Sequence, residues 1–120
     1  MSTVVVLGAS DDEDRVSRQA VQRLLKNQHA VIPVNLKGGE VAGLPILLSL
    51  KEITRPVDTV TMYIGPRHQS AVIDDIVALR PRRVIFNPGS ENPAIYPRLR
   101  AAGISIEEAC TLVLLGTRQF

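Results

Sequence analysis

The sequence is poor in cysteine and in aromatic residues. Its 120 residues include one cysteine, Cys110, two phenylalanines, two tyrosines and no tryptophan. A single cysteine excludes an internal disulfide and favours a reducing compartment, so a cytoplasmic location is expected. Few aromatic side chains are present to stack on bases, and the basic residues are scattered. Nucleic acid is therefore not the expected partner.

Long apolar runs are also absent, and no basic segment followed by an apolar stretch stands at the N-terminus. We therefore expect neither a membrane span nor secretion. The formal net charge is only +2, from 14 basic and 12 acidic residues. Hydrophobic residues make up 45% of the chain, enough for a core without disulfides, so residues 1–120 are expected to form one domain.

Short apolar runs alternate with amphipathic segments along the whole chain. Residues 3–7 form a β-branched run that ends at Gly8, which is typical of a strand buried on both faces of a parallel sheet. The other predicted strands are residues 30–34, 58–64, 83–86 and 104–106. Helices are predicted over residues 16–27, 66–79 and 93–102, with a helical turn near 49–53. Residues 111–115 fit a last helical turn or a packed extension.

This alternation predicts an α/β fold: a doubly wound, Rossmann-like, five-stranded parallel sheet with helices on both faces. The expected strand order is three-two-one-four-five. Pro33 indicates that the second strand either ends its pairing there or lies at an edge. In such a sheet ligands bind beyond the carboxyl ends of the strands where the order reverses, here between strands one and four. This order would place residues 8–10 beside residues 87–90.

The turn after the first strand has the features of a phosphate site. Gly8 permits a sharp turn, Ala9 is small, and Ser10 offers a hydroxyl at a helix entrance. A purely structural turn with a capping serine explains the same three residues equally well. A dinucleotide fingerprint would have three glycines here and a carboxylate in place of Asn35, so NAD is disfavoured. A P-loop with its lysine is also absent.

Several segments together resemble a known family. They are Gly8, Ala9 and Ser10 with Arg15 and Ser17; residues 32–35; Gly43 and residues 49–53; residues 57–58; residues 87–90; and residues 102–104 with 108–110. The chain is similar over almost its whole length to the CoA-binding domain proteins, Rossmann-like domains related to the CoA-binding part of succinyl-CoA synthetase. The resemblance implies a ligand, coenzyme A or an acyl-CoA, bound through its nucleotide without catalysis.

The resemblance also assigns site residues. Gly8, Ala9, Ser10, Arg15 and Ser17 are expected to face the pyrophosphate. Pro33, Val34 and Asn35 are expected on the adenosine side, and Asn87, Pro88, Gly89 and Ser90 along the pantetheine arm. Leu36 stands where the family commonly has a second proline, and Asn87 replaces a glutamine.

Other residues leave alternatives open. Asp11, Asp12, Glu13 and Asp14 would oppose a pyrophosphate unless they point into solvent and complement the helix dipole. Lys37 is a further candidate for phosphate contact. Cys110 is expected near the ligand edge, where it would form a mixed disulfide with CoA or, as the preferred reading, pack as an inert thiol.

No metal-ligand spacing and no catalytic grouping are recognisable, so neither a metal site nor catalytic residues are expected. The alternatives are an NAD(P)-binding or acyl-CoA ligase-type enzyme component, which would have an enzyme partner, and a regulatory interaction domain. In the last case the apolar tail at residues 112–115 would dock a partner or form a homodimer.

Overall fold

The computed structural model describes residues 2–12 and 15–120. In this part of the chain five parallel strands form one sheet in the order β2-β1-β5-β6-β7. The strands are β1 (Thr3–Leu7), β2 (Ala30–Val34), β5 (Thr59–Met62), β6 (Arg83–Phe86) and β7 (Ser105–Glu108). The predicted α/β class and the five parallel strands are confirmed.

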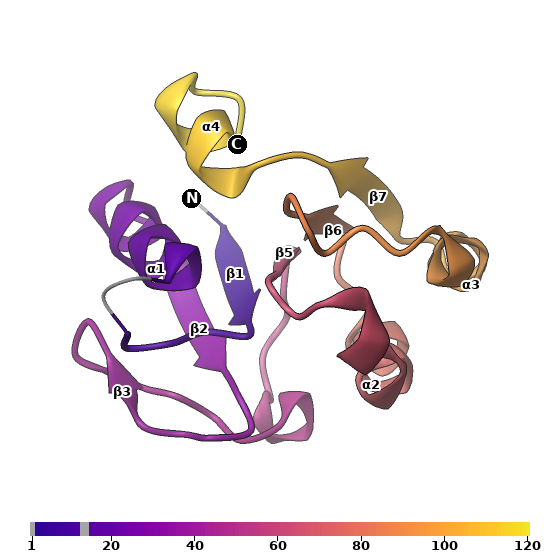
Figure 1. Ribbon diagram of the computed structural model, residues 1–120, viewed down its shortest axis with the longest axis horizontal. Helices are drawn as coiled ribbons and strands as arrows, with labels where there is room; N and C mark the ends of the chain where they lie inside the picture. The colour runs from indigo at the N-terminus through magenta and orange to yellow at the C-terminus, as the bar shows by residue number, and fades with distance from the viewer. Residues whose placement is uncertain (1, 13–14) are drawn as a thin grey trace.

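Helices cover both faces of this sheet (Figure 1). One face carries α1 (Val16–Lys26) and α4 (Thr111–Gly116). The other carries α2 (Ile73–Leu79) and α3 (Tyr96–Ala101). The described residues also form three short 3-10 helices, η1 (Leu50–Glu52), η2 (Pro66–Ala71) and η3 (Pro93–Ile95). None of the helices in the described residues is long and apolar enough to cross a membrane.

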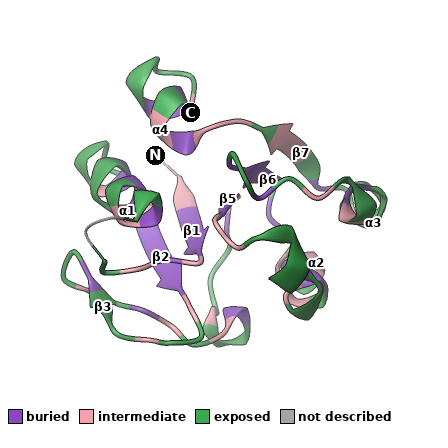
Figure 2. Ribbon diagram, viewed as in Figure 1, coloured by how far each residue is buried: buried purple, intermediate pink, exposed green. Residues whose placement is uncertain are grey.

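Side chains alternate between the two faces along β1, and both faces are buried. Val4 and Val6 pack with α1 residues such as Val21, while Val5 and Leu7 pack with α2 residues such as Ile76. Figure 2 shows the central strands as buried and the outer surfaces of the helices as exposed. Each fully buried valine contributes about 1.5–3 kcal/mol, so this double burial holds β1 at the centre of the sheet.

The predicted strand order is wrong. β5 pairs with β1, on the side opposite β2, so β2 is an edge strand and the third strand along the chain is interior. Pro33 gives the physical reason. Its carbonyl oxygen accepts the Leu47 N–H at 2.9 Å on the outer side of β2, the side where proline has no N–H to offer. A full ladder along that side is excluded.

A short connection covers the outer edge of β2 instead. A hairpin of β3 (Glu40–Val41) and β4 (Leu44–Pro45) turns through Ala42 and Gly43, which have φ angles of 51° and 80°. Positive φ at both central residues suits a tight hairpin. Leu47 then forms a single parallel bridge with Val34. The chain therefore reaches the carboxyl edge of the sheet just before η1.

Candidate functional site

A cavity of about 670 Å³ opens at the carboxyl edge of the sheet, where β1, β2 and β5 end. Its volume lies within the range of small-molecule sites. It is lined by Leu7, Gly8, Ser10, Arg15, Val34, Asn35, Leu36, Lys37, Leu48, Ser49, Leu50, Tyr63, Ile64, Gly65, His68, Ala71, Val72 and Asp75. Because β5 rather than β6 is the neighbour of β1, the expectation that residues 8–10 lie beside residues 87–90 is wrong. The site lies between the ends of β1, β2 and β5.

The turn after β1 requires a glycine for two reasons. Gly8 has a φ of +92°, a conformation that other residues rarely adopt. A Cβ atom at this position would lie 3.1 Å from both the Ile64 Cγ1 atom and the Tyr63 carbonyl carbon. The N–H groups of Gly8 and Ala9 donate to the Val34 carbonyl oxygen at 2.8 and 3.1 Å. These two donors hold the loop in place and do not point at a ligand.

Ser10 and Arg15 lie between this turn and α1, and both line the cavity. The Ser10 hydroxyl accepts the Asp12 N–H at 3.0 Å, and the Arg15 N–H donates to the Asp12 carbonyl oxygen at 3.0 Å. α1 begins at Val16, and Asp11 and Asp12 are exposed in the preceding loop rather than in its first turn. Glu13 and Asp14 lie outside the described residues, so their predicted effect on a phosphate stays a prediction.

The loop after β2 is tied to the loop after β1. The Asn35 side-chain amide donates to the Ala9 carbonyl oxygen at 2.6 Å, and its oxygen accepts the Lys37 N–H at 3.4 Å. Asn35 thus ties together the two loops that form this side of the cavity. Lys37 and the largely exposed Leu36, at 85% exposure, line its rim.

The opposite wall comes from η1, η2 and α2. Ser49 and Glu52 form a capping box: the Lys51 N–H donates to the Ser49 hydroxyl at 3.1 Å, and the Ser49 N–H donates to Glu52 Oε2 at 3.0 Å. This cap presents Leu48, Ser49 and Leu50 to the cavity. The wall formed by Ile64, Gly65, His68, Ala71, Val72 and Asp75 was not predicted from the sequence, because the predicted order placed β5 elsewhere.

The charges around the cavity are mixed but favour an anion. Arg15 and Lys37 carry positive charge on one side, and Asp75 is the carboxylate that lines the other. Between them most lining side chains are aliphatic. A molecule with an anionic part and a less polar part fits this distribution.

Tyr63 lines the cavity, but its hydroxyl is buried away from it. No hydrogen bond to this hydroxyl is formed within the described residues. Burial raises the pKa of Tyr63 to about 12, although the nearby hydroxyls of Thr61 and Thr111 act in the opposite direction. Those two hydroxyls bind each other at 2.7 Å. Tyr63 therefore contributes a neutral ring wall rather than an acid or a base.

Asn87 and Ser90 are buried behind the cavity and do not line it. The Asn87 amide donates to the Thr61 hydroxyl at 2.6 Å and to the Met62 carbonyl at 2.9 Å, and its oxygen accepts the Thr111 N–H at 2.9 Å. The Ser90 hydroxyl donates to the Asn87 carbonyl oxygen at 2.8 Å. These side chains join β5, β6 and α4 within the fold. Pro88 and Gly89 are exposed.

The remaining predicted site residues also lie outside the cavity lining. Ala9 and Ser17 are buried, and Pro33 is buried within β2. Cys110 is half-buried at the N-terminal cap of α4. The structure thus brings Gly8, Ser10, Arg15, Val34, Asn35 and Lys37 to one cavity.

Comparison with known proteins gives the class of this domain. The family model described as CoA binding domain matches residues 2–116. A crystal structure of an uncharacterized protein has a TM-score of 0.90 at 40% identity, covering 100% of this chain and 98% of that chain. The uncharacterized protein YneT of Bacillus subtilis is 26% identical over 103 residues, which is 86% of this chain and 76% of YneT.

A larger enzyme contains the same fold. The dinucleotide-forming acetyl-coenzyme A synthetase 1 of Ca. Korarchaeum cryptofilum, in complex with phosphate and ADP, has a TM-score of 0.78 at 21% identity. The match covers 90% of this chain and 25% of that enzyme, and it shows a shared fold alone. With the family match over residues 2–116, the chain belongs to the CoA-binding domain family, and the resemblance seen in the sequence is confirmed.

Proposed function

We propose that this chain, as one domain over residues 1–120, binds coenzyme A or an acyl-CoA in the cavity at the ends of β1, β2 and β5, without catalysis. The observation that carries the proposal is the convergence of Ser10, Arg15, Asn35 and Lys37 on one cavity in a chain of this family. The cytoplasm, where CoA is plentiful and thiols stay reduced, is the location that fits this function.

The cationic side and the aliphatic walls of the cavity orient the ligand. The pyrophosphate lies beside Ser10 and Arg15, where the guanidinium supplies charge-assisted hydrogen bonds. The adenosine part lies beside Asn35 and Lys37. The pantetheine arm leaves along His68 and Val72, because these line the cavity and residues 87–90 do not. Contact of Ala9, Ser17, Pro33, Cys110 or residues 87–90 with the ligand stays a prediction.

Thermal unfolding with a ligand panel tests the proposal. The purified protein is melted alone and with CoA, acetyl-CoA, NAD, NADP and ATP. A ligand that binds only the folded state stabilises it by about 2.7 kcal/mol at a hundredfold excess over Kd. A rise in the midpoint with the CoA species and not with NAD or NADP supports the proposal. A response to NAD or NADP alone would support an oxidoreductase component, and no response at all would overturn binding.

A further inference from the structure

A second, smaller cavity adjoins the first on the α2 face of the sheet. It has a volume of about 230 Å³ and is lined by Leu50, Lys51, Ile53, Asp75, Ala78 and Leu79. We call it the side groove. It lies between η1 and α2, which pack against each other. Leu50 and Asp75 line both cavities, so the side groove adjoins the large cavity at these two residues.

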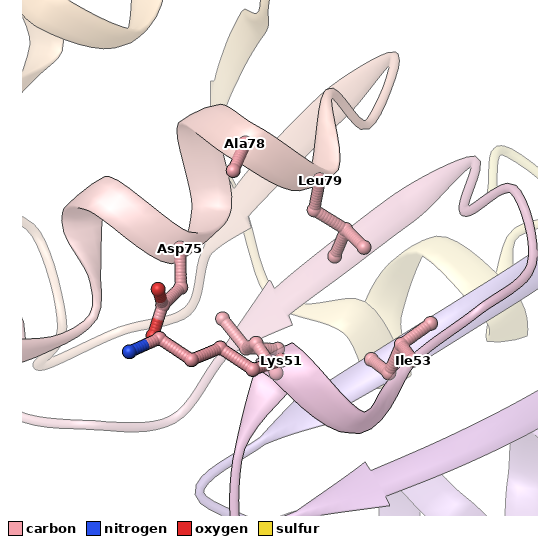
Figure 3. Close-up of a pocket in the computed structure, with 6 residues that line it drawn as sticks. Lys51, Ile53, Asp75, Ala78 and Leu79 are labelled. Atoms are coloured by element: carbon pink, nitrogen blue, oxygen red, sulfur yellow. The ribbon is translucent and has the colours of Figure 1, made fainter.

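The two ends of the side groove differ in polarity (Figure 3). The Lys51 side chain extends toward Asp75, and both charged groups gather at one end of the groove. Ile53 and Leu79 lie at the other end. The charged end is the one shared with the large cavity. A ligand that enters from the large cavity would therefore pass polar groups first and reach aliphatic side chains last.

The size of the side groove limits what it holds. Its volume is about that of eight liquid water molecules. A short chain of methylene groups fits this space, whereas a nucleotide does not. Ordered water gains little here, because a retained water needs two to four polar partners and four of the six lining residues are aliphatic.

We propose that the side groove is an acyl subsite, which takes the short, uncharged acyl chain of an acyl-CoA whose nucleotide occupies the large cavity. The inference rests on the proposed function. Its thioester lies near Leu50 and Asp75, and its methylenes contact Ile53, Ala78 and Leu79. A terminal carboxylate on the acyl chain gains nothing in the groove, because it would reach the aliphatic end beside Ile53 and Leu79 and lie away from Lys51.

Calorimetric titration with CoA, butyryl-CoA and succinyl-CoA tests this subsite. Burial of methylenes increases affinity by up to about fourfold each, so butyryl-CoA is expected to bind roughly tenfold more tightly than CoA in this open groove. Succinyl-CoA, of similar length but charged, is expected to bind no more tightly than CoA. Equal affinities for CoA and butyryl-CoA would overturn the subsite and leave the proposed function standing. Binding of none of the three would overturn both.

Two leucine substitutions test whether the gain in butyryl-CoA affinity arises in the side groove. Ala78 is exposed on α2 and lines the groove, so Ala78→Leu fills it without disturbing the core. Ala101, exposed at the end of α3 and outside both cavities, gives the matched control Ala101→Leu. A78L is expected to reduce butyryl-CoA affinity to that of CoA and to leave CoA affinity unchanged, whereas A101L changes neither. An equal loss for both ligands in A78L would show that the groove is not an acyl subsite.

Discussion

The Asn35 side-chain amide donates a 2.6 Å hydrogen bond to the Ala9 carbonyl oxygen and so joins the loops that follow β2 and β1. These loops supply the walls on which the proposed nucleotide site depends. The bond spans 26 positions in the sequence, so it fixes tertiary structure rather than a local turn. Its loss should therefore affect both folding and binding.

Asn35→Ala removes this bond and leaves the Ala9 carbonyl oxygen without that donor. We expect the free energy of unfolding to fall by about 1 kcal/mol and the CoA affinity to fall roughly threefold to tenfold, because the walls lose their fixed spacing. Asn27→Ala is the matched control, since Asn27 also donates to a backbone carbonyl, that of Arg23 at 2.7 Å, but at the end of α1. Urea unfolding and calorimetric titration of both variants make the comparison. An equal loss of CoA affinity in N27A would contradict a specific role for Asn35.

Gly8→Ala tests how closely β1 and β5 approach at the site. The added methyl group would meet Tyr63 and Ile64 at 3.1 Å in a backbone conformation with φ of +92°. We expect a loss of about 2–3 kcal/mol in the free energy of unfolding, from steric contact added to backbone strain. Gly103→Ala is the control: its φ is +81°, but nothing lies within 4 Å of its added Cβ. Strain alone should cost G103A about 1 kcal/mol, and equal losses in the two variants would show that the contact is unimportant.

The sequence predicted the strands well, because each buried parallel strand is a short apolar run bounded by turn residues. The predicted run at residues 3–7 coincides with β1, and residues 83–86 coincide with β6. The order of the strands cannot be predicted in the same way. Residues 35–58 contain no long apolar run that shows which side of β1 the next strand takes. Pro33, in the strand before them, fits either an edge strand or the end of its pairing, so it does not decide the order.

The error in strand order explains why the wall of the cavity that follows β5 was not predicted from the sequence. Gly8, Ser10 and Lys37 follow β1 and β2, which are neighbours in either order. The family resemblance assigns Arg15 and Asn35 to the same site. His68, Val72 and Asp75 follow β5, which the prediction placed away from β1. Their side chains carry no local motif, so only the pairing of β5 with β1 shows that they face the cavity.

Arg15→Gln combined with Lys37→Gln tests the end of the site that is proposed to bind the ligand's phosphates. Both side chains line the large cavity and are largely exposed, so solvent screens each contribution. We expect about a fivefold loss of CoA affinity for each charge removed, and a weaker dependence of the affinity on salt. Arg55→Gln, an exposed arginine outside both cavities, is expected to change neither. Titrations at low and high salt compare the variants, and unchanged affinity in the double variant would place the phosphates elsewhere.

Asp58 lies just before β5, at the amino ends of the strands and away from the cavity, and it links the stability of the fold to pH. Its hydrogen-bonded ion pair with Arg82, at 3.0 Å, holds its pKa below the usual value, and the Thr59 hydroxyl bond acts in the same direction. A carboxyl with a lowered folded-state pKa stabilises the fold above its unfolded pKa of about 4, and this contribution is lost as the pH falls through the lowered value.

Asp58→Asn should therefore reduce the free energy of unfolding at neutral pH, by less than about 1 kcal/mol because Arg82 is exposed. The difference from the unmodified protein should shrink as the pH falls below about 4. Asp74→Asn, which breaks the more exposed ion pair with Arg98, is the control and should have little effect at either pH. Urea unfolding across this pH range makes the measurement, and a difference that grows toward acid pH would contradict the argument.

A substitution of Asn87, at the end of β6, distinguishes a structural role of this residue from a ligand-binding role. Its side chain is 3% exposed, and it is hydrogen-bonded to Thr61, Met62 and Thr111. Asn87→Ala leaves those buried polar groups without this partner, so we expect the free energy of unfolding to fall by about 2–4 kcal/mol. Its CoA affinity, measured well below the lowered melting temperature, should change less than twofold.

Comparing the CoA affinity and stability of variants at Asn87 and Arg15 shows which role Asn87 has. A ligand contact would lower CoA affinity in N87A, as is expected when the Arg15 charge is removed, in addition to any loss of stability. A structural residue lowers the melting temperature with affinity preserved, because the bound state forms the same cavity once the chain is folded. Since both N–H donors of the Asn87 amide are used within the protein, the side chain can donate to the pantetheine arm only by breaking one of these bonds. Loss of CoA affinity in N87A with little loss of stability would show that the loop at residues 87–90 rearranges to meet the ligand.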